Sequence, residues 1–179
     1  MPPRPALAVL LVVLLAAACG LDDDEQTAAD NLSALLVAPG AGEADRDAAG
    51  CIAEKWVGEV GTDALVDAGL LDEDLEARRP AVRRLVAGEL PVSREVAAGL
   101  AASRLDCADF DALALDQKRD HPDASAEELD EYADCLKLLD QDDWRASMVG
   151  YYTGKPAAGL EEFRLDLRSC NEMLAATDR

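Results

Sequence analysis

Residues 51–71 constrain the fold more than any other stretch of the sequence. They begin with a cysteine on the apolar face of a helical pattern and continue into a second, shorter helix that ends at Gly69. A looser copy of this arrangement recurs from Cys135 to Gly154. Because a cysteine starts both copies, the pattern predicts a helical scaffold in which one unit has been duplicated.

The other apolar residues also recur with a helical period of about 3.6 residues. Pro80 lies in the helix predicted over about residues 72–87, and it is expected to kink this helix or to break it into two pieces. No useful length of sequence alternates with period two, so the pattern indicates an all-α fold. Helices are predicted over about residues 28–36, 45–60, 62–69, 72–87, 94–114, 126–139 and 141–154, with a last one after Pro156.

Several predicted helix starts carry local signals. Thr62 and Ser93 can each accept a backbone N–H through the side-chain hydroxyl, as N-cap residues do. Ser125 and Glu128 fit a capping box. The acidic run 140–143 also predicts a helix cap. Calcium binding is the alternative for this run, but it lacks the mid-loop glycine and the distal acid of an EF-hand.

The first eighteen residues are typical of an export signal. Arg4 supplies positive charge and residues 6–18 form an unbroken apolar run, which is shorter than the ~20 residues that a membrane span needs. Small residues then precede Cys19, as in a bacterial lipobox. A plain secretory signal with an Ala-x-Ala cleavage site is the alternative. We expect lipid on Cys19, a short acidic tether over residues 19–27, and a cell-membrane, extracytoplasmic location.

The charge of the chain limits its partners. Lys and Arg number 17 against 37 Asp and Glu, which gives a net charge of −20. Such a charge excludes nonspecific binding to nucleic acid and adhesion to anionic lipid through basic patches. It keeps the domain soluble and favours a cationic envelope or protein partner. Half of the residues are hydrophobic, so the chain is not an acidic disordered segment.

Two parts of the chain, residues 28–108 and 109–179, place similar features in the same order. Each has a capped helix with a cysteine, a glycine that closes a short helix, an Ala-Ala-Gly-Leu run and a second cysteine. Chance resemblance between alanine-rich helices is the alternative. We expect two related helical units, tied by disulfides and packed as a small bundle.

The first unit contains a motif of the form Cys-x-Ala-x-x-x-Val-x-x-x-Gly. Cys51, Ala53, Val57 and Gly61 carry it. This layout resembles repeated helical domains in predicted lipoproteins and secreted proteins of actinobacteria. The resemblance covers about residues 28–107, whereas the second unit keeps the cysteines and lacks the equivalent of Gly61. It implies location and architecture, because no activity is assigned to those domains.

The cysteines are most simply explained as structural. Five is an odd number for an oxidising compartment, but lipid on Cys19 leaves four, which allow three pairings. The repeat favours the pairs Cys51–Cys107 and Cys135–Cys170. Metal ligation and a redox-active thiol pair are the alternatives, but the sequence has no CxxC and no Cys/His pair at ligand spacing. We expect disulfides, no metal and no cofactor.

Residues that catalysis commonly requires are scarce. The single histidine, His121, lies in an acidic linker, so no Ser/His/Asp or Cys/His site can be assembled. A pair of surface carboxylates stays open as an enzymatic alternative. The aromatic residues could line a ligand cleft, although core packing explains them as well; they include Trp56, Trp144, Tyr151 and Tyr152.

The sequence thus predicts a noncatalytic interaction or ligand-binding module of the cell envelope. A structural or regulatory accessory lipoprotein without a ligand is the main alternative, followed by an enzyme that uses surface carboxylates.

Overall fold

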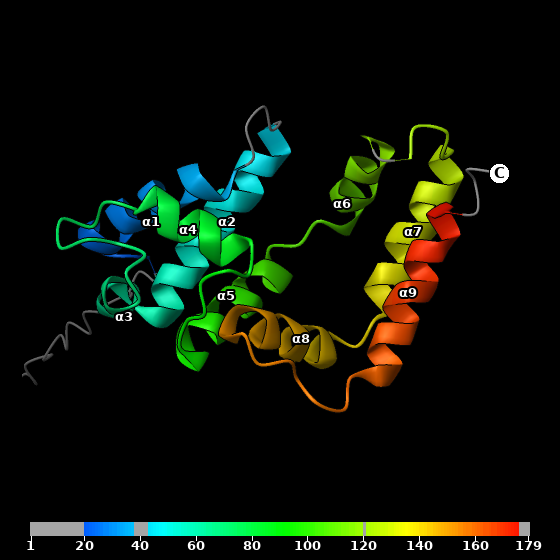
Figure 1. Ribbon diagram of the computed structural model, residues 1–179. Coiled ribbons are helices and arrows are strands. Elements are labelled where there is room, and N and C mark those ends of the chain that lie inside the picture. The colour runs from blue at the N-terminus through cyan, green and yellow to red at the C-terminus, as the bar shows by residue number, and fades with distance from the viewer. Residues whose placement is uncertain (1–19, 38–42, 120, 176–179) are drawn as a thin grey trace, which may run out of the picture.

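The all-α prediction is confirmed by a computed structural model of the protein (Figure 1). The structure describes residues 20–37, 43–119 and 121–175. These residues form nine α-helices and one short 3-10 helix, without a strand. The helices are α1 (Asp23–Leu36), α2 (Glu43–Val60), α3 (Thr62–Asp67), α4 (Arg79–Val86), α5 (Arg94–Asp106), α6 (Phe110–Asp116), α7 (Ala126–Leu138), α8 (Gln141–Thr153) and α9 (Glu161–Ala175), and the 3-10 helix is Gln117–Arg119.

The helices enclose two hydrophobic cores. The first core lies among α1 to α5, where α2 packs against both α1 and α5. The second core lies among α6, α7 and α9, which occupy the other side of the molecule (Figure 1). Fully or nearly fully buried side chains of the first core include Leu32, Trp56, Val57, Leu85 and Leu100, and those of the second include Leu129, Ala133, Leu136, Phe163 and Leu174.

Helix α8 contacts both cores. It packs along α5, and its buried Tyr152 belongs to the first core. Eight residues earlier in α8, Trp144 packs against the second core, with its ring centroid 6.2 Å from that of Phe163. Residues 109–179 therefore supply a part of the first core. The division at residue 108 into two related units stays a prediction.

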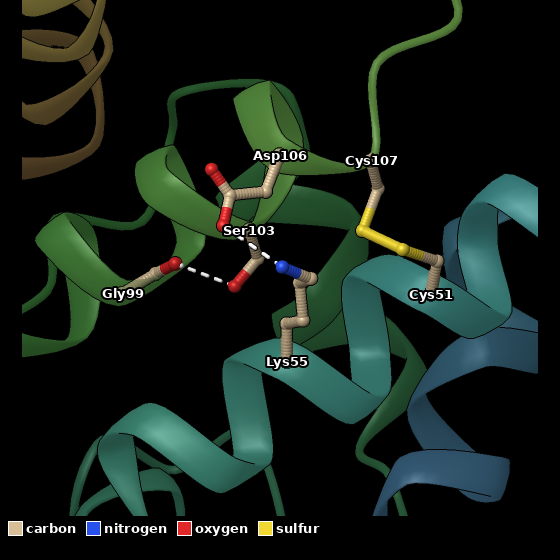
Figure 2. Close-up of a disulfide and its surroundings, with 6 residues drawn as sticks. All are labelled: Cys51, Lys55, Gly99, Ser103, Asp106 and Cys107. Atoms are coloured by element: carbon tan, nitrogen blue, oxygen red, sulfur yellow. Dashed lines mark hydrogen bonds and ion pairs between the residues drawn. A yellow bond between two sulfur atoms is a disulfide. The ribbon is translucent and has the colours of Figure 1, made fainter.

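Both disulfides that the repeat favours are present. Cys51 in α2 pairs with Cys107 after α5, and Cys135 in α7 pairs with Cys170 in α9; the Cα–Cα distances are 5.9 and 5.7 Å. Each disulfide joins two helices of one core. Figure 2 shows that the first disulfide is flanked by the ion pair between Lys55 Nζ and Asp106 Oδ2, at 2.9 Å.

Local chemistry sets most helix starts as expected. Ser93 accepts the backbone N–H of Val96, and Asp140 accepts two N–H groups of the first turn of α8. Ser125 and Glu128 form the predicted capping box. The hydrogen bonds from Ser125 lower the pKa of Glu128, because they stabilise its carboxylate. Helix α3 is followed by Gly69, the residue at which the sequence predicted its end, and Gly69 has the left-handed φ of 71° that is common after a helix.

The structure differs from the expectation at the N-terminal tether. Helix α1 begins at Asp23, so residues 23–27 are helical. Asp22 and Glu25 form a capping box, in which the Asp22 carboxylate accepts the Glu25 N–H at 2.8 Å. Acidic residues in a first turn also interact favourably with the helix dipole. The acidic run therefore starts the helix, and only residues 20–22 of the described chain precede it.

Helix boundaries differ in three further places. Thr62 is the first helical residue of α3, and Gly61 occupies the N-cap without a side-chain hydrogen bond. Residues 72–78 are not helical, because the Asp72 carboxylate accepts two backbone N–H groups in a turn that pairs Leu71 with Ala77. The long helix expected over 94–114 is broken: α5 ends at Asp106, and Asp109 caps α6 through two N–H groups.

None of the described helices is long and apolar enough to span a membrane. The predicted export signal and Cys19 lie outside the described residues.

Candidate functional site

A cavity of about 340 Å³ lies where the two cores meet, and we name it the inter-core cavity. Its walls come from α2, α5, α6 and α8 and from the linker between α5 and α6. Pockets of roughly 300–1,000 Å³ are typical of small-molecule sites. The lining residues are Asp45, Ala48, Ile52, Arg104, Leu105, Cys107, Ala108, Asp109, Phe110, Ala112, Leu113, Trp144 and Met148.

The wall of the inter-core cavity is mainly apolar. Trp144 and Met148 lie one turn apart on α8, and the ring of Trp144 is 5.6 Å from that of Phe110 on α6. Leu113, one turn further along α6, keeps 46% of its surface exposed. An exposed leucine beside a cavity leaves apolar surface that a ligand can cover. The cavity therefore suits an apolar molecule.

Arg104 supplies a polar group to this wall, and one of its hydrogen-bond donors is unused. Its Nε atom is buried and has no hydrogen-bond partner among the described residues. Its guanidinium lies 5.9 Å from the ring centroid of Tyr152. Burial raises the pKa of Tyr152, which keeps that phenol neutral under ordinary conditions. Since a buried donor without an acceptor is costly, an acceptor on a ligand would stabilise Arg104.

The acidic residues of the wall have structural partners. The Asp109 carboxylate accepts the N–H groups of Asp111 and Ala112 at the start of α6. Asp45, near the start of α2, is exposed and also takes part in an interaction. The inter-core cavity therefore offers a ligand an apolar wall and the hydrogen-bond donors of Arg104.

The first disulfide positions this wall. Cys107 lines the cavity, and its bond to Cys51 holds the end of α5 against α2. The Ser103 hydroxyl donates to the carbonyl of Gly99 at 2.7 Å inside α5 (Figure 2). Because the chain turns from α5 into α6 directly after Cys107, the disulfide also fixes where Phe110 begins its helix.

The predicted site residues are distributed between the two cores. Cys107 lines the cavity and is bonded to Cys51, whereas Cys135 and Cys170 belong to the second core. The described residues contain no group of three or more His, Cys, Asp or Glu that could hold a metal ion. His121 is half-buried, and its backbone N–H donates to the carbonyl of Gln117 at 2.7 Å.

The predicted aromatic residues have different positions. Trp144 lines the cavity, while Trp56 and Tyr152 are core residues. Tyr151 is half exposed; it packs on Gly88, and its hydroxyl donates to the carbonyl of Val86 at 3.1 Å.

Sequence reasoning did not identify Arg104, Leu113 or Met148 as members of one site. Phe110 falls within the single helix that the sequence predicted over residues 94–114, whereas it begins α6 in the structure. Because four helices line the cavity, its residues have no regular spacing in the sequence. The nearest sequence signal was Asp109, because aspartate is a common N-cap residue and Asp109 is the N-cap of α6.

No protein-family model matches the chain, and comparison with curated proteins and with solved structures finds no similar protein.

Proposed function

We propose that the protein is a noncatalytic ligand-binding module of the cell envelope and that the inter-core cavity is its binding site. The single observation that carries this proposal is an apolar cavity of about 340 Å³ with an unsatisfied arginine donor in its wall. The ligand class is a small apolar molecule with one hydrogen-bond acceptor or negative charge. The apolar part would pack on Trp144 and Met148, and the acceptor would meet Arg104.

Anilinonaphthalenesulfonate tests this proposal, because it combines apolar rings with one sulfonate. We expect saturable binding of one molecule per chain, measured by its fluorescence at constant protein concentration. Leu113→Glu, which places a charge on the cavity wall, should weaken binding about tenfold, since burying an unpaired carboxylate costs more than 1.4 kcal/mol.

Leu115→Glu is the matched control. Leu115 lies on the same helix, is 65% exposed and does not line the cavity. It should leave the affinity for the probe unchanged. Binding that does not saturate, or equal losses in the two variants, would contradict the proposed site and favour the alternative of an accessory protein without a ligand.

The proposal includes attachment to the membrane through lipid on Cys19. It rests on the apolar run before Cys19, on the resemblance to actinobacterial lipoproteins, and on the odd cysteine count once both disulfides are formed. Leu21 packs against the first core, so the anchored residue would lie two positions from the folded domain. The acidic surface suits a cationic envelope partner, and co-purification at low and high salt tests for one.

The lipid is tested by intact mass and by partition into detergent. The wild-type chain expressed in an actinobacterial host should begin at Cys19 and carry the mass of acyl chains. Cys19→Ala should leave the chain unprocessed or free of lipid, and it should move to the aqueous phase if a signal peptidase still cleaves it. Identical mass and partition of the two chains would refute the anchor.

A further inference from the structure

A second concave site lies between the start of α5 and the length of α8. This α5–α8 cleft has a volume of about 650 Å³ and uses a different part of the α8 surface from the inter-core cavity. The two sites share no lining residue. The cleft is lined by Val92, Ser93, Arg94, Ala98, Asp142, Arg145, Ala146, Val149, Gly150, Thr153, Lys155 and Ala157.

The charge of the cleft is opposite to that of the chain. Acids outnumber Lys and Arg by 37 to 17 in the whole sequence, yet the cleft has three cations and one acid: Arg94, Arg145, Lys155 and Asp142. Neither Arg94 nor Lys155 makes an ion pair with another described residue. Because three cations and one carboxylate leave a surplus of two positive charges, the cleft matches a doubly charged anion.

Arg145 is the most constrained of the three cations. Its Nη1 donates to the Asp142 carboxylate at 3.0 Å, in an exposed ion pair on the surface of α8. Its Nε is buried and has no hydrogen-bond partner among the described residues. A guanidinium presents its donors in a planar fork that matches the oxygens of phosphate and carboxylate groups. The Arg145 side chain is 40% exposed and lines the cleft, so an oxyanion there would meet the accessible part of the guanidinium.

The lining of the cleft includes small apolar residues and closely packed backbone. The N–H of Val92 donates to the Tyr152 carbonyl at 3.0 Å, which joins the entry of α5 to the end of α8. At Gly150 an added Cβ would lie 2.8 Å from the backbone nitrogen of Ala157, so the loop after α8 runs directly over the helix. This packing holds the backbone of Lys155 in place. The backbone around the cleft is therefore largely set before a ligand binds.

We propose that the α5–α8 cleft binds a small dianion, a phosphate monoester or a dicarboxylate, through Arg94, Arg145 and Lys155. This site is separate from the inter-core cavity and does not depend on the function proposed for it. The net charge of −20 repels anions from the chain as a whole, so the cleft favours ligands whose two charges match its surplus of two positive charges. Binding weakens as salt screens the exposed Arg94 and Lys155.

Nuclear magnetic resonance of the chain beginning at Gly20, with both disulfides formed, tests the proposal. That chain retains both cores and both disulfides, which lie within residues 20–175. The probes are inorganic phosphate and succinate, with acetate as the singly charged comparison. We expect saturable shifts of the Arg145 Nε–H signal with phosphate or succinate, and affinity for acetate at least tenfold weaker.

Arg145→Gln should weaken binding of the dianion about tenfold, as expected for the loss of a charge-assisted hydrogen-bonded pair. The double variant Arg94→Gln with Lys155→Gln should weaken it to a similar degree. These two side chains are exposed, so that variant keeps the fold. Arg83→Gln removes one exposed arginine of α4 outside the cleft and should leave the affinity unchanged. Shifts that never saturate, or equal weakening in Arg83→Gln, would overturn the proposal.

Discussion

Replacing Cys51 and Cys107 together with alanine is expected to lower the free energy of unfolding by about 4 kcal/mol. The disulfide closes a loop of 56 residues, and the chain-entropy model gives that value for a loop of this length. The loss is large beside the ~5–15 kcal/mol by which domains are usually stable. Urea unfolding of the oxidised chains, followed by circular dichroism, measures it.

The matched control is the double variant Cys135→Ala with Cys170→Ala. Its 35-residue loop predicts a loss of about 4 kcal/mol as well. The two variants should differ at the inter-core cavity. Loss of the first disulfide frees the linker that carries Cys107 and should weaken the binding of anilinonaphthalenesulfonate, whereas the control should retain it. Unchanged stability without Cys51 and Cys107 would show that this cross-link contributes nothing to the fold.

Trp56→Ala is expected to destabilise the first core by about 3–5 kcal/mol, the range for removing a large aromatic side chain from a core. Trp56 is the largest fully buried side chain of the described residues. It lies against Gly99 of α5, where an added Cβ would be 3.3 Å from its ring. Its Nε1 donates to the Val96 carbonyl at 3.1 Å, so the substitution removes a buried hydrogen bond together with the packing. Thermal and urea unfolding provide the measurement.

Trp56→Phe separates these two contributions. It keeps most of the apolar volume and loses the hydrogen bond to Val96, so it should destabilise the chain clearly less than Trp56→Ala. Leu138→Ala is a surface control, because Leu138 is 86% exposed; its effect should stay within about 0.5 kcal/mol. If Trp56→Ala had as small an effect, the ring would not be a main support of the first core.

The sequence predicted the features that depend on near neighbours. The helical period predicted helices over residues 45–60 and 126–139, which contain the buried Trp56 and Leu136. Caps such as Ser93 and Ser125 were readable because the capping side chain and its N–H partner lie three residues apart. The disulfide pairing could be predicted for another reason. The same features follow in the same order in the two parts of the chain, and this order favoured the pairs Cys51–Cys107 and Cys135–Cys170, which are 56 and 35 residues apart.

Features that depend on competing local interactions were harder to predict. The helix expected from residue 72 is replaced by a turn. In this turn the Asp72 carboxylate accepts the backbone N–H groups of Asp74 and Glu76, which competes with helix formation. Ala108 and Asp109 fit the apolar and polar pattern of a continuous helix, so periodicity did not show the break before Phe110. Both cavities were beyond prediction, since their walls combine helices whose crossing geometry is not encoded in any single segment.

The contact of α8 with both cores also constrains the order in which the chain folds. A polypeptide emerges from the ribosome or from an export channel with its N-terminus first. Cys51 and Cys107 are both available early, but Tyr152, which completes the first core, emerges 45 residues after Cys107. The first core is incomplete during that interval, and its α5 face is open. The first disulfide can form during that time, and it would hold α2 and α5 together until α8 arrives.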